Sequence, residues 1–248
     1  MSEKYICIAG KNQCAIDVVK YLLKKKFKKN LLILPNKSDK GIDSWQPSLR
    51  KFAKIKKIRI INENKLKKIK NLFLFSIEFE KILRVKEYKS KNLFNVHFSL
   101  LPKFRGCHTN YLQIKFGEKR SGVTLHKIDK GVDTGKIIDQ LEFIIDINDT
   151  AKKNYMKLMK FSVKIFIKNF SSILENKYKL KKQNLKKSSY FSRKYVDYQK
   201  EKFVNFKKPS LKIHNKIRAL IFPPYQLPIV NRKKVKKSIF LNKKIYLT

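Results

Sequence analysis

Acidic residues are scarce in this sequence, and the marks of several common protein classes are missing. Only 18 Asp and Glu stand against 61 Lys and Arg in 248 residues, a formal net charge of +43. No run approaches the roughly 18 apolar residues of a membrane-spanning helix, and no secretory cleavage pattern follows the first residues. The cysteines (Cys7, Cys14 and Cys107) are odd in number and lack metal-ligand spacing. We therefore expect no membrane insertion, no metal site and a reducing, cytoplasmic setting.

Arginine is also scarce, which bears on what the positive charge means. A strongly basic chain first suggests a nucleic-acid binder. Arginine is the side chain best suited to bidentate recognition of phosphates and base edges, but most basic residues here are lysines spread along the chain. Lysine, asparagine and isoleucine are abundant together, which favours a compositional bias over specific nucleic-acid binding. Weak attraction to anionic metabolites or membrane surfaces stays open.

Hydrophobic residues make up 42% of the chain, enough for a sizeable core. Short apolar runs predict buried strands, and apolar residues at helical spacing predict helices between them. Continuous strands that alternate with helices indicate an α/β fold with a mostly parallel sheet and helices on both faces. The predicted strands cover residues 5–10, 31–34, 58–61, 72–75, 93–97, 123–128 and 137–145.

The second half of the chain has a different character. Asp149-Thr150 is typical of a helix N-cap and precedes a long amphipathic pattern. A lysine-rich, irregular stretch follows, then a predicted helix over 210–220 and a tail that resembles two short strands. We expect one α/β domain over residues 1–175 and a small α+β C-terminal extension over residues 176–248.

The end of the first predicted strand points away from a dinucleotide site. Gly10 is followed by Lys11 and Asn12, which does not match the G-x-G-x-x-G fingerprint. In an open α/β sheet the crevice at the carboxyl ends of the strands can instead take another ligand.

Three polar residues are predicted to meet at such an edge. Asn95 and His97 lie two apart on a strand and project from the same face, and the glycines around Asp133 let a loop bring a carboxylate to the same place. An amide can stabilise the oxyanion of acyl transfer, imidazole can take a proton from an attacking amine, and a carboxylate can fix the imidazole. A structural histidine near a polar turn is the alternative interpretation.

Two motifs around these residues resemble the folate-dependent formyltransferases. The first, N-x-H-x-S-L-L-P-x-x-R-G, covers residues 95–106; the second, G-V-T-L-H-x-x-D-x-G-x-D-T-G-x-I, covers residues 122–137. The resemblance implies a formyltransferase-like, Rossmann-like sheet and N10-formyltetrahydrofolate as the formyl donor, with no metal. It also implies that Asn95, His97 and Asp133 form the catalytic set.

Other segments resemble the sugar N-formyltransferases that act on dTDP-4-amino-4,6-dideoxyglucose. These are residues 35–48, 75–79 and 213–226. The stretch after Glu175 is also short for the RNA-binding barrel of the related tRNA enzyme. The resemblance implies a cytoplasmic, homodimeric enzyme that formylates a nucleotide-linked amino sugar for O-antigen or other surface glycans. Formylation of a 3-amino sugar or of methionyl-tRNA, and polyanion binding without catalysis, are the alternatives.

Further contacts are predicted beside the catalytic set. The candidate cofactor-binding residues are Glu78, Phe79, Ile82 and Asp129. The candidate substrate-binding residues are Trp45, Ser99, Arg105, Asn215, Arg218 and Tyr225.

Several of these residues have a plainer interpretation. Trp45 can equally anchor a core or a lid, and Tyr225 can simply pack in a turn. Arg218, with Asn215 one turn before it, can hold a pyrophosphate or can be a solvent-facing helix charge. His126 lies within a strand pattern and is interpreted as a packed residue rather than a catalyst.

Overall fold

The computed structural model describes residues 3–248; Met1 and Ser2, the first residues of the predicted 1–175 domain, lie outside the described part. The chain forms two compact units that interleave along the sequence. The first unit contains residues up to 97, 123–141 and 159–186, and the second contains 98–122, 142–158 and 187–248. The boundary at residue 175, as the limit of a separately folding domain, stays a prediction.

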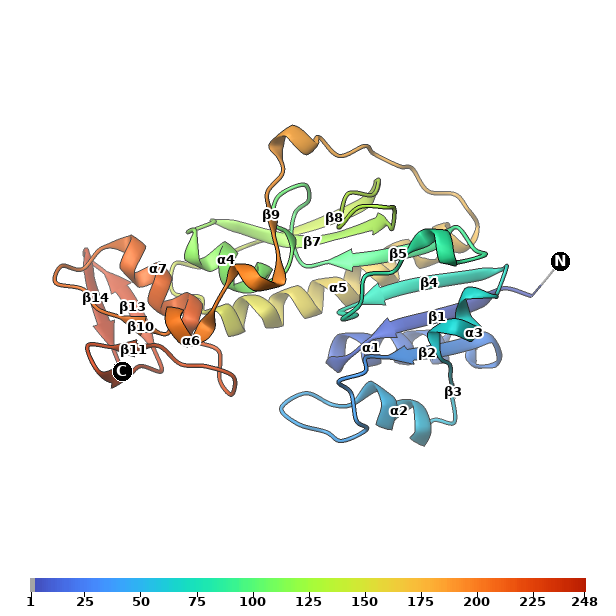
Figure 1. Ribbon diagram of the computed structural model, residues 1–248, viewed down its shortest axis with the longest axis horizontal. Helices are drawn as coiled ribbons and strands as arrows, with labels where there is room; N and C mark the ends of the chain where they lie inside the picture. The colour runs from blue at the N-terminus through green and yellow to red at the C-terminus, as the bar shows by residue number, and fades with distance from the viewer. Residues whose placement is uncertain (1–2) are drawn as a thin grey trace. The chain divides into compact units, whose positions relative to one another are not determined.

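A seven-stranded sheet has the order β3-β2-β1-β4-β5-β7-β8 (Figure 1). The strands from β3 to β5 pair in parallel, and β7 pairs antiparallel to β5. All seven predicted strands are present, so the α/β fold with a mostly parallel sheet is confirmed. Their bounds are β1 Tyr5–Gly10, β2 Leu31–Pro35, β3 Arg59–Ile60, β4 Leu72–Ile77, β5 Asn92–His97, β7 Arg120–Lys127 and β8 Ile137–Ile144.

Helices cover one face of the sheet in the first unit through aromatic packing. Phe166 of α5 (Ala151–Leu174) meets Phe75 of β4 edge-on, with ring centroids 4.9 Å apart. Phe170, one turn later, contacts Tyr21 of α1 (Asn12–Lys24) at 6.0 Å. Such aromatic pairs add to the stabilisation that burial of the rings provides. α1 is one of the helices that the sequence predicts between the strands, from apolar residues at helical spacing over 15–23.

The opposite face of the sheet is covered by α3 (Glu63–Lys67) and the chain that follows β4. Leu66, Leu83 and Tyr88 pack there against strand residues that alternate with those of the first face. These strand residues are Cys7, Ala9, Leu32, Leu34, Leu72, Leu74 and Leu93. Because both faces are covered, the strands read as continuous apolar runs.

Polar side chains mark where several helices begin. Ser48 caps α2 (Leu49–Ile55), and Asn62 caps α3 by accepting a hydrogen bond from a backbone N–H three residues on. Thr150 accepts from the backbone N–H of Lys153 at 3.2 Å, directly before α5. The predicted cap at 149–150 is thus confirmed for Thr150, whereas Asp149 accepts from the N–H of Asp146 at 2.9 Å.

The second unit has its own core, in which α4 (Thr109–Lys115) packs against α7 (Leu211–Leu220). The predicted second helix is confirmed, with Ser210 as its N-cap. The remaining elements of the described chain are β6 Arg105–Gly106, β9 Tyr190–Phe191, α6 Tyr198–Glu201, β10 Phe203–Val204, β11 Ile229–Val230, β12 Lys233–Lys234, β13 Ser238–Leu241 and β14 Lys244–Leu247, with 3₁₀ turns at Lys28–Asn30, Val85–Glu87, Leu185–Lys187 and Arg193–Tyr195. No helix among residues 3–248 has the length and apolar character needed to cross a membrane.

The C-terminal tail contains four short strands where the sequence predicts two. Each of its two hairpins turns through a pair of residues with positive φ, Asn231-Arg232 between β11 and β12 and Asn242-Lys243 between β13 and β14. Two-residue turns of this kind match the twist of the strands, and asparagine tolerates the left-handed conformation well. The two asparagines were therefore the turn signals that divide the tail.

Glu201 ties the chain after β9 to α4 within the second unit. Its carboxylate accepts from the buried Tyr111 hydroxyl at 3.1 Å and from Lys115 Nζ at 2.7 Å, and Lys216 Nζ lies 4.0 Å away. Burial acts to raise the pKa of Glu201, but the hydrogen bond and charge of Lys115 outweigh it, so the pKa lies below its ordinary value. The ionised carboxylate therefore stabilises the fold.

We expect Glu201→Gln to lower the free energy of unfolding at pH 7 by about 1–2 kcal/mol, because charged hydrogen bonds are lost. A depressed pKa gives stability that is present above the unfolded value, about 4.3, and lost as the pH falls through the folded value. Urea denaturation should therefore show the difference between wild type and variant shrinking below about pH 4. Glu175→Gln, at an exposed pair with Lys177, is the control and should change little. Equal stability of Glu201→Gln and wild type at pH 7 would contradict this role.

Candidate active site

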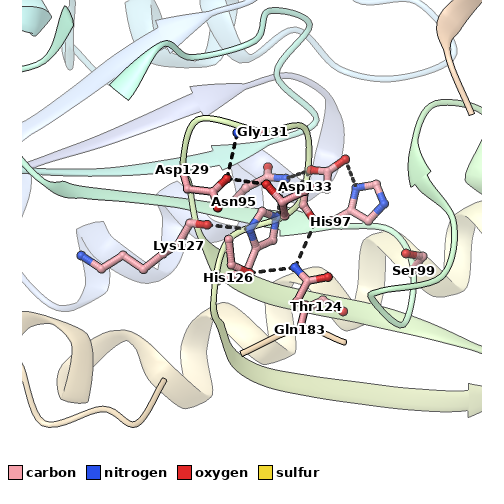
Figure 2. A network of polar contacts seen from close by, with 12 residues as sticks. Asn95, His97, Ser99, Thr124, His126, Lys127, Asp129, Gly131, Asp133 and Gln183 are labelled. Carbon is pink, nitrogen blue, oxygen red and sulfur yellow. Dashed lines mark hydrogen bonds and ion pairs between the residues drawn. The ribbon is translucent and has the colours of Figure 1, made fainter. Parts of the chain in front are cut away.

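Asn95 and His97 lie at the carboxyl end of β5 and project toward the same loop (Figure 2). The strand period of two places them on one face. In the antiparallel pairing with β7, Asn95 stands opposite His126 and His97 opposite Thr124. His97 is 7% exposed, so its imidazole is held in a mostly dry environment. The predicted pairing of these two side chains at the strand end is confirmed.

The loop between β7 and β8 presents Asp133 to them. Asp133 has φ +53°, a left-handed conformation that is unfavourable for a residue with a side chain. A Cβ on Gly135 would lie 1.7 Å from the carbonyl oxygen of Lys127, so only glycine allows the loop to pass that close to the strand. The loop is thus folded back on the end of β7, and the glycine after Asp133 makes this possible.

Asp129 holds the same loop from its beginning. Its Oδ1 accepts hydrogen bonds from the N–H of Gly131 at 3.1 Å and from the hydroxyl of Thr134 at 2.6 Å. This is the usual behaviour of an aspartate that closes a turn over the residues after it. The structure gives Asp129 a role in shaping the loop; its predicted contact with a cofactor stays a prediction.

The carboxylate of Asp133 meets three side chains. Its Oδ2 lies 3.4 Å from Nδ1 of His97, and its Oδ1 accepts from Nδ2 of Asn95 at 3.2 Å. Nε2 of His126 lies 3.5 Å from the same Oδ1. The Asp133 side chain is only 13% exposed. The structure therefore brings together the three residues of the predicted catalytic set and adds a second histidine.

His126 is buried, as its strand pattern predicts, but it is also a polar partner of the set. Its Nδ1 lies 2.7 Å from the carbonyl oxygen of Lys127, which can only accept, so Nδ1 carries a hydrogen. In the neutral ring Nε2 is then an acceptor, and it faces Nδ2 of Asn95 at 3.2 Å. Sequence reasoning missed this contact because it depends on the antiparallel register of β5 and β7.

The two hydrogens of the Asn95 amide are consequently both engaged, one by His126 and one by Asp133. This fixes which end of the amide is nitrogen, since both neighbours are acceptors. The amide is held rigidly beside His97. Donation from Asn95 to a developing oxyanion requires one of these two bonds to be exchanged for a bond to the ligand.

This arrangement has the parts of an acyl-transfer site. A carboxylate beside Nδ1 favours the imidazole tautomer protonated there, which makes Nε2 of His97 the basic nitrogen. An amide N–H beside it can stabilise negative charge on oxygen. No group of three His, Cys, Asp or Glu side chains within residues 3–248 is arranged to hold a metal ion.

The predicted cofactor-binding residues after β4 form a turn tied to neighbouring strand ends. Glu78 has φ +56°; its carbonyl oxygen accepts from Asn36 at 3.0 Å and its carboxylate from Asn12 at 2.9 Å. Phe79 packs against the core, and Ile82 is 71% exposed. Asn36, which sequence reasoning did not select, is fully buried after β2 and also accepts from the N–H of Glu80 at 3.3 Å.

Trp45 is half-buried in the loop before α2. That loop is held by Asp39, which accepts from the Ser48 hydroxyl at 2.5 Å and from the backbone N–H of Arg50 at 2.9 Å. The predicted contact of Trp45 with a substrate stays a prediction.

In the second unit, Asn215 and Arg218 are buried rather than exposed. Arg218 is 3% exposed and donates to Asn215 Oδ1 at 2.9 Å and to the carbonyl oxygens of Asp146 at 3.1 Å and Asp149 at 2.7 Å. Burial lowers the pKa of Arg218 to about 10, against the opposing effect of the two aspartates. The solvent-facing alternative for Arg218 is wrong, and its contacts favour a structural role. Binding of a pyrophosphate by this pair stays a prediction.

The other predicted substrate contacts of this unit differ in exposure. Ser99 is fully buried and donates to the carbonyl oxygen of Lys103 at 2.7 Å. Arg105 donates to the Ser188 hydroxyl at 3.3 Å, and Tyr225 is 65% exposed. The structure thus leaves Tyr225 accessible to a ligand and gives Ser99 a contact within its own turn.

The fold and the site together define a protein of the acyl-transfer class on a Rossmann-like sheet. A sequence model of the family described as "Formyl transferase" matches residues 55–170. The crystal structure of WlaRD, a sugar 3N-formyltransferase, is 48% identical with a TM-score of 0.93, covering 98% of this chain and 88% of that one. The chain belongs to the formyltransferase family.

Two further comparisons agree with this membership. The N-formyltransferase of Helicobacter canadensis is 45% identical with a TM-score of 0.92, covering 97% of this chain and 89% of that one. The bifunctional polymyxin resistance protein ArnA of Wigglesworthia glossinidia brevipalpis is 39% identical over 161 residues, which are 64% of this chain. The chain spans 24% of the length of that curated relative. The family predicted from the two motifs is confirmed.

We expect Asp129→Ala to loosen the loop that carries Asp133, because the N–H of Gly131 and the hydroxyl of Thr134 lose their acceptor. The unfolding free energy should fall by about 1–2 kcal/mol. Limited trypsin digestion read by mass should show faster cleavage after Lys130 and Lys136, which are exposed on the loop. Asp129→Asn keeps an acceptor oxygen and serves as the control. Unchanged cleavage in Asp129→Ala would show that the turn holds without this carboxylate.

Proposed function

We propose that this protein transfers the formyl group of N10-formyltetrahydrofolate to the amino group of a dTDP-linked amino sugar. The observation that carries the proposal is the meeting of Asn95, His97 and Asp133 at the carboxyl end of β5. It is supported by similarity over nearly the whole chain to WlaRD, solved in the presence of dTDP and 5-N-formyl-THF. The Helicobacter canadensis enzyme was solved with folinic acid and dTDP-3-aminofucose.

The residues at the strand ends fit a reduced folate as the donor. Exposed Ile82 offers apolar surface beside a turn in which Asn36 donates to the carbonyl oxygen of Glu78 and Asn12 donates to its carboxylate. A pocket for a flat heterocycle needs such apolar contact with a few fixed polar groups. When bound, N10-formyltetrahydrofolate supplies the formyl carbon that the amine attacks. Glu78, Phe79, Ile82 and Asp129 remain our candidates around it.

The catalytic set then acts on one bond-forming and one bond-breaking step. Asn95 steadies the oxygen that becomes negative when the amine nitrogen bonds to the formyl carbon, and His97 can donate to that oxygen once its Nε2 carries a proton. His97, oriented by Asp133, takes the proton that the amine loses, and it returns a proton to the departing nitrogen as the carbon–nitrogen bond of the donor breaks. The amine must be neutral to attack, so activity should fall at low pH.

The comparisons change which amino sugar we propose as the acceptor. The sequence segments favoured a 4-amino sugar. The two sugar enzymes of highest identity reported above are named for a 3N-transfer and for a complex with a 3-amino sugar. We therefore propose a dTDP-linked 3-amino sugar as the acceptor and keep the 4-amino sugar as the second candidate.

A substrate panel tests this proposal. The chain is incubated with N10-formyltetrahydrofolate and, separately, with dTDP-linked 3-amino and 4-amino dideoxyhexoses and with methionyl-tRNA, and products are read by mass. We expect formylation of a 3-amino sugar with the highest kcat/KM. Preference for a 4-amino sugar would restore the first expectation, and transfer only to methionyl-tRNA, or to none of the acceptors, would overturn the sugar assignment.

Asp133→Asn tests the role of the carboxylate. We expect kcat to fall by about 10²–10⁴-fold, because His97 loses the group that orients it and balances its charge. Thermal unfolding should stay near wild type, since the amide keeps the size of the side chain. Asp17→Asn, on the exposed side of α1, is the matched control. Near-normal turnover in Asp133→Asn would refute the catalytic assignment.

Polyanion binding is the second candidate function, and the net charge of +43 is the observation that favours it. Binding to a phosphate backbone weakens steeply as salt rises, because counterions are released. We expect formyl transfer to persist at moderate salt, where binding to heparin or RNA is lost. A steep fall of kcat/KM in parallel with polyanion affinity would favour the second candidate. A homodimer, a cytoplasmic location and a role in surface-glycan synthesis remain predictions.

A further inference from the structure

Gln183 lies outside both sequence motifs, yet it contacts the loop that carries Asp133 (Figure 2). Its Nε2 donates to the carbonyl oxygen of Asp133 at 2.9 Å and to that of Gly135 at 2.7 Å. A side-chain amide has two N–H donors, so both are used on this loop. The opposite orientation would place an amide oxygen against two carbonyl oxygens, which fixes the assignment of the amide.

The backbone before Gln183 is itself anchored to the sheet. Ile137, the first residue of β8, exchanges two hydrogen bonds of 2.8 Å with Lys181. Gln183 follows two residues later, so the chain is tied to the sheet directly before it. The amide can therefore hold the loop against a fixed support.

The loop needs such a support because of the conformation of Asp133. A left-handed φ at a residue with a side chain costs of order 1–3 kcal/mol and persists only where the surroundings determine it. Asp129 secures the N–H of Gly131 and the hydroxyl of Thr134, but it does not contact the main chain of Asp133. Gln183 acts on the carbonyl group of that very residue.

The buried Oε1 of Gln183 has no hydrogen-bond partner within the described residues. Leaving a buried acceptor unpaired costs about 1–3 kcal/mol. The use of both amide donors on the loop that carries Asp133 points to a role in placing that loop.

We propose that Gln183 is a positioning residue that holds the carboxylate of Asp133 at its distance from His97. The proposal rests on the proposed function and deepens it. The carboxylate of Asp133 contacts His97 and Asn95 directly, whereas Gln183 acts through the main chain of Asp133. Loss of the two hydrogen bonds from Gln183 should let the backbone of Asp133 relax from the left-handed conformation. The carboxylate of Asp133 should then move away from Nδ1 of His97.

Gln183→Glu tests this role, because it keeps the shape of the side chain and replaces the donor by a carboxylate oxygen. We expect kcat to fall at least 10-fold while KM for the amino sugar changes less than 3-fold, since a positioning residue affects the reacting geometry more than substrate binding. Hydrogen exchange of the peptide covering 129–137 should become at least 10-fold faster. Gln199→Glu makes the same charge change at an exposed site and is the matched control.

A second variant and a second readout keep the outcomes distinct. Gln183→Met removes the donors without adding charge, and it replaces Gln183→Glu if that protein does not fold; it should show the same loss of kcat and faster exchange. A kcat equal to that of the wild type in either folded variant would overturn the proposed role of Gln183. An unchanged rate of hydrogen exchange in the peptide covering 129–137 would overturn it as well. If the wild-type protein transfers no formyl group, the proposed function fails, and the exchange measurement alone still decides whether Gln183 holds the loop.

Discussion

The antiparallel pairing of β5 with β7 is the constraint on which the site depends. The parallel pairing of β4 with β5 is enough to place Asn95 and His97 at one edge of the sheet. The histidine opposite Asn95 comes from the antiparallel pairing of β5 with β7. Because β7 runs in the reverse direction, His126 stands directly across from Asn95. The orientation of the amide and the position of the carboxylate both follow from this one change of strand direction.

The loop between β7 and β8 is held in a conformation that its own sequence does not favour. Its local contribution is Asp129, which closes the turn from within. Its close approach to the strand requires Gly135, and its main chain is held from outside by Gln183. The strained backbone of Asp133 is therefore held by a contact within the loop, by the small size of a glycine and by a residue distant in sequence. Together they place a carboxylate in a mostly buried position beside two imidazole rings.

The predictions made from sequence succeeded where a local pattern carried the information. Buried strands and long helices were found because apolar runs and helical spacing reflect which face each segment buries. The two motifs identified the family because the catalytic residues and the loop glycines lie close together in sequence. The short elements α3 and α4 were missed, since five to seven residues leave too few turns for a periodic signal. The tail was predicted as two strands instead of four because the turns of its hairpins contain asparagine but no glycine.

The sequence by itself determined the α/β class, the strand that carries Asn95 and His97, and the glycine loop around Asp133, because each is written in neighbouring residues. Only the tertiary structure decided that His126 faces Asn95, that Arg218 is buried among backbone carbonyls, and that Gln183 holds the Asp133 loop. These contacts join residues that are distant in sequence, and their partners are fixed by strand register and packing. A single sequence records the residue types of such pairs but not which of them meet.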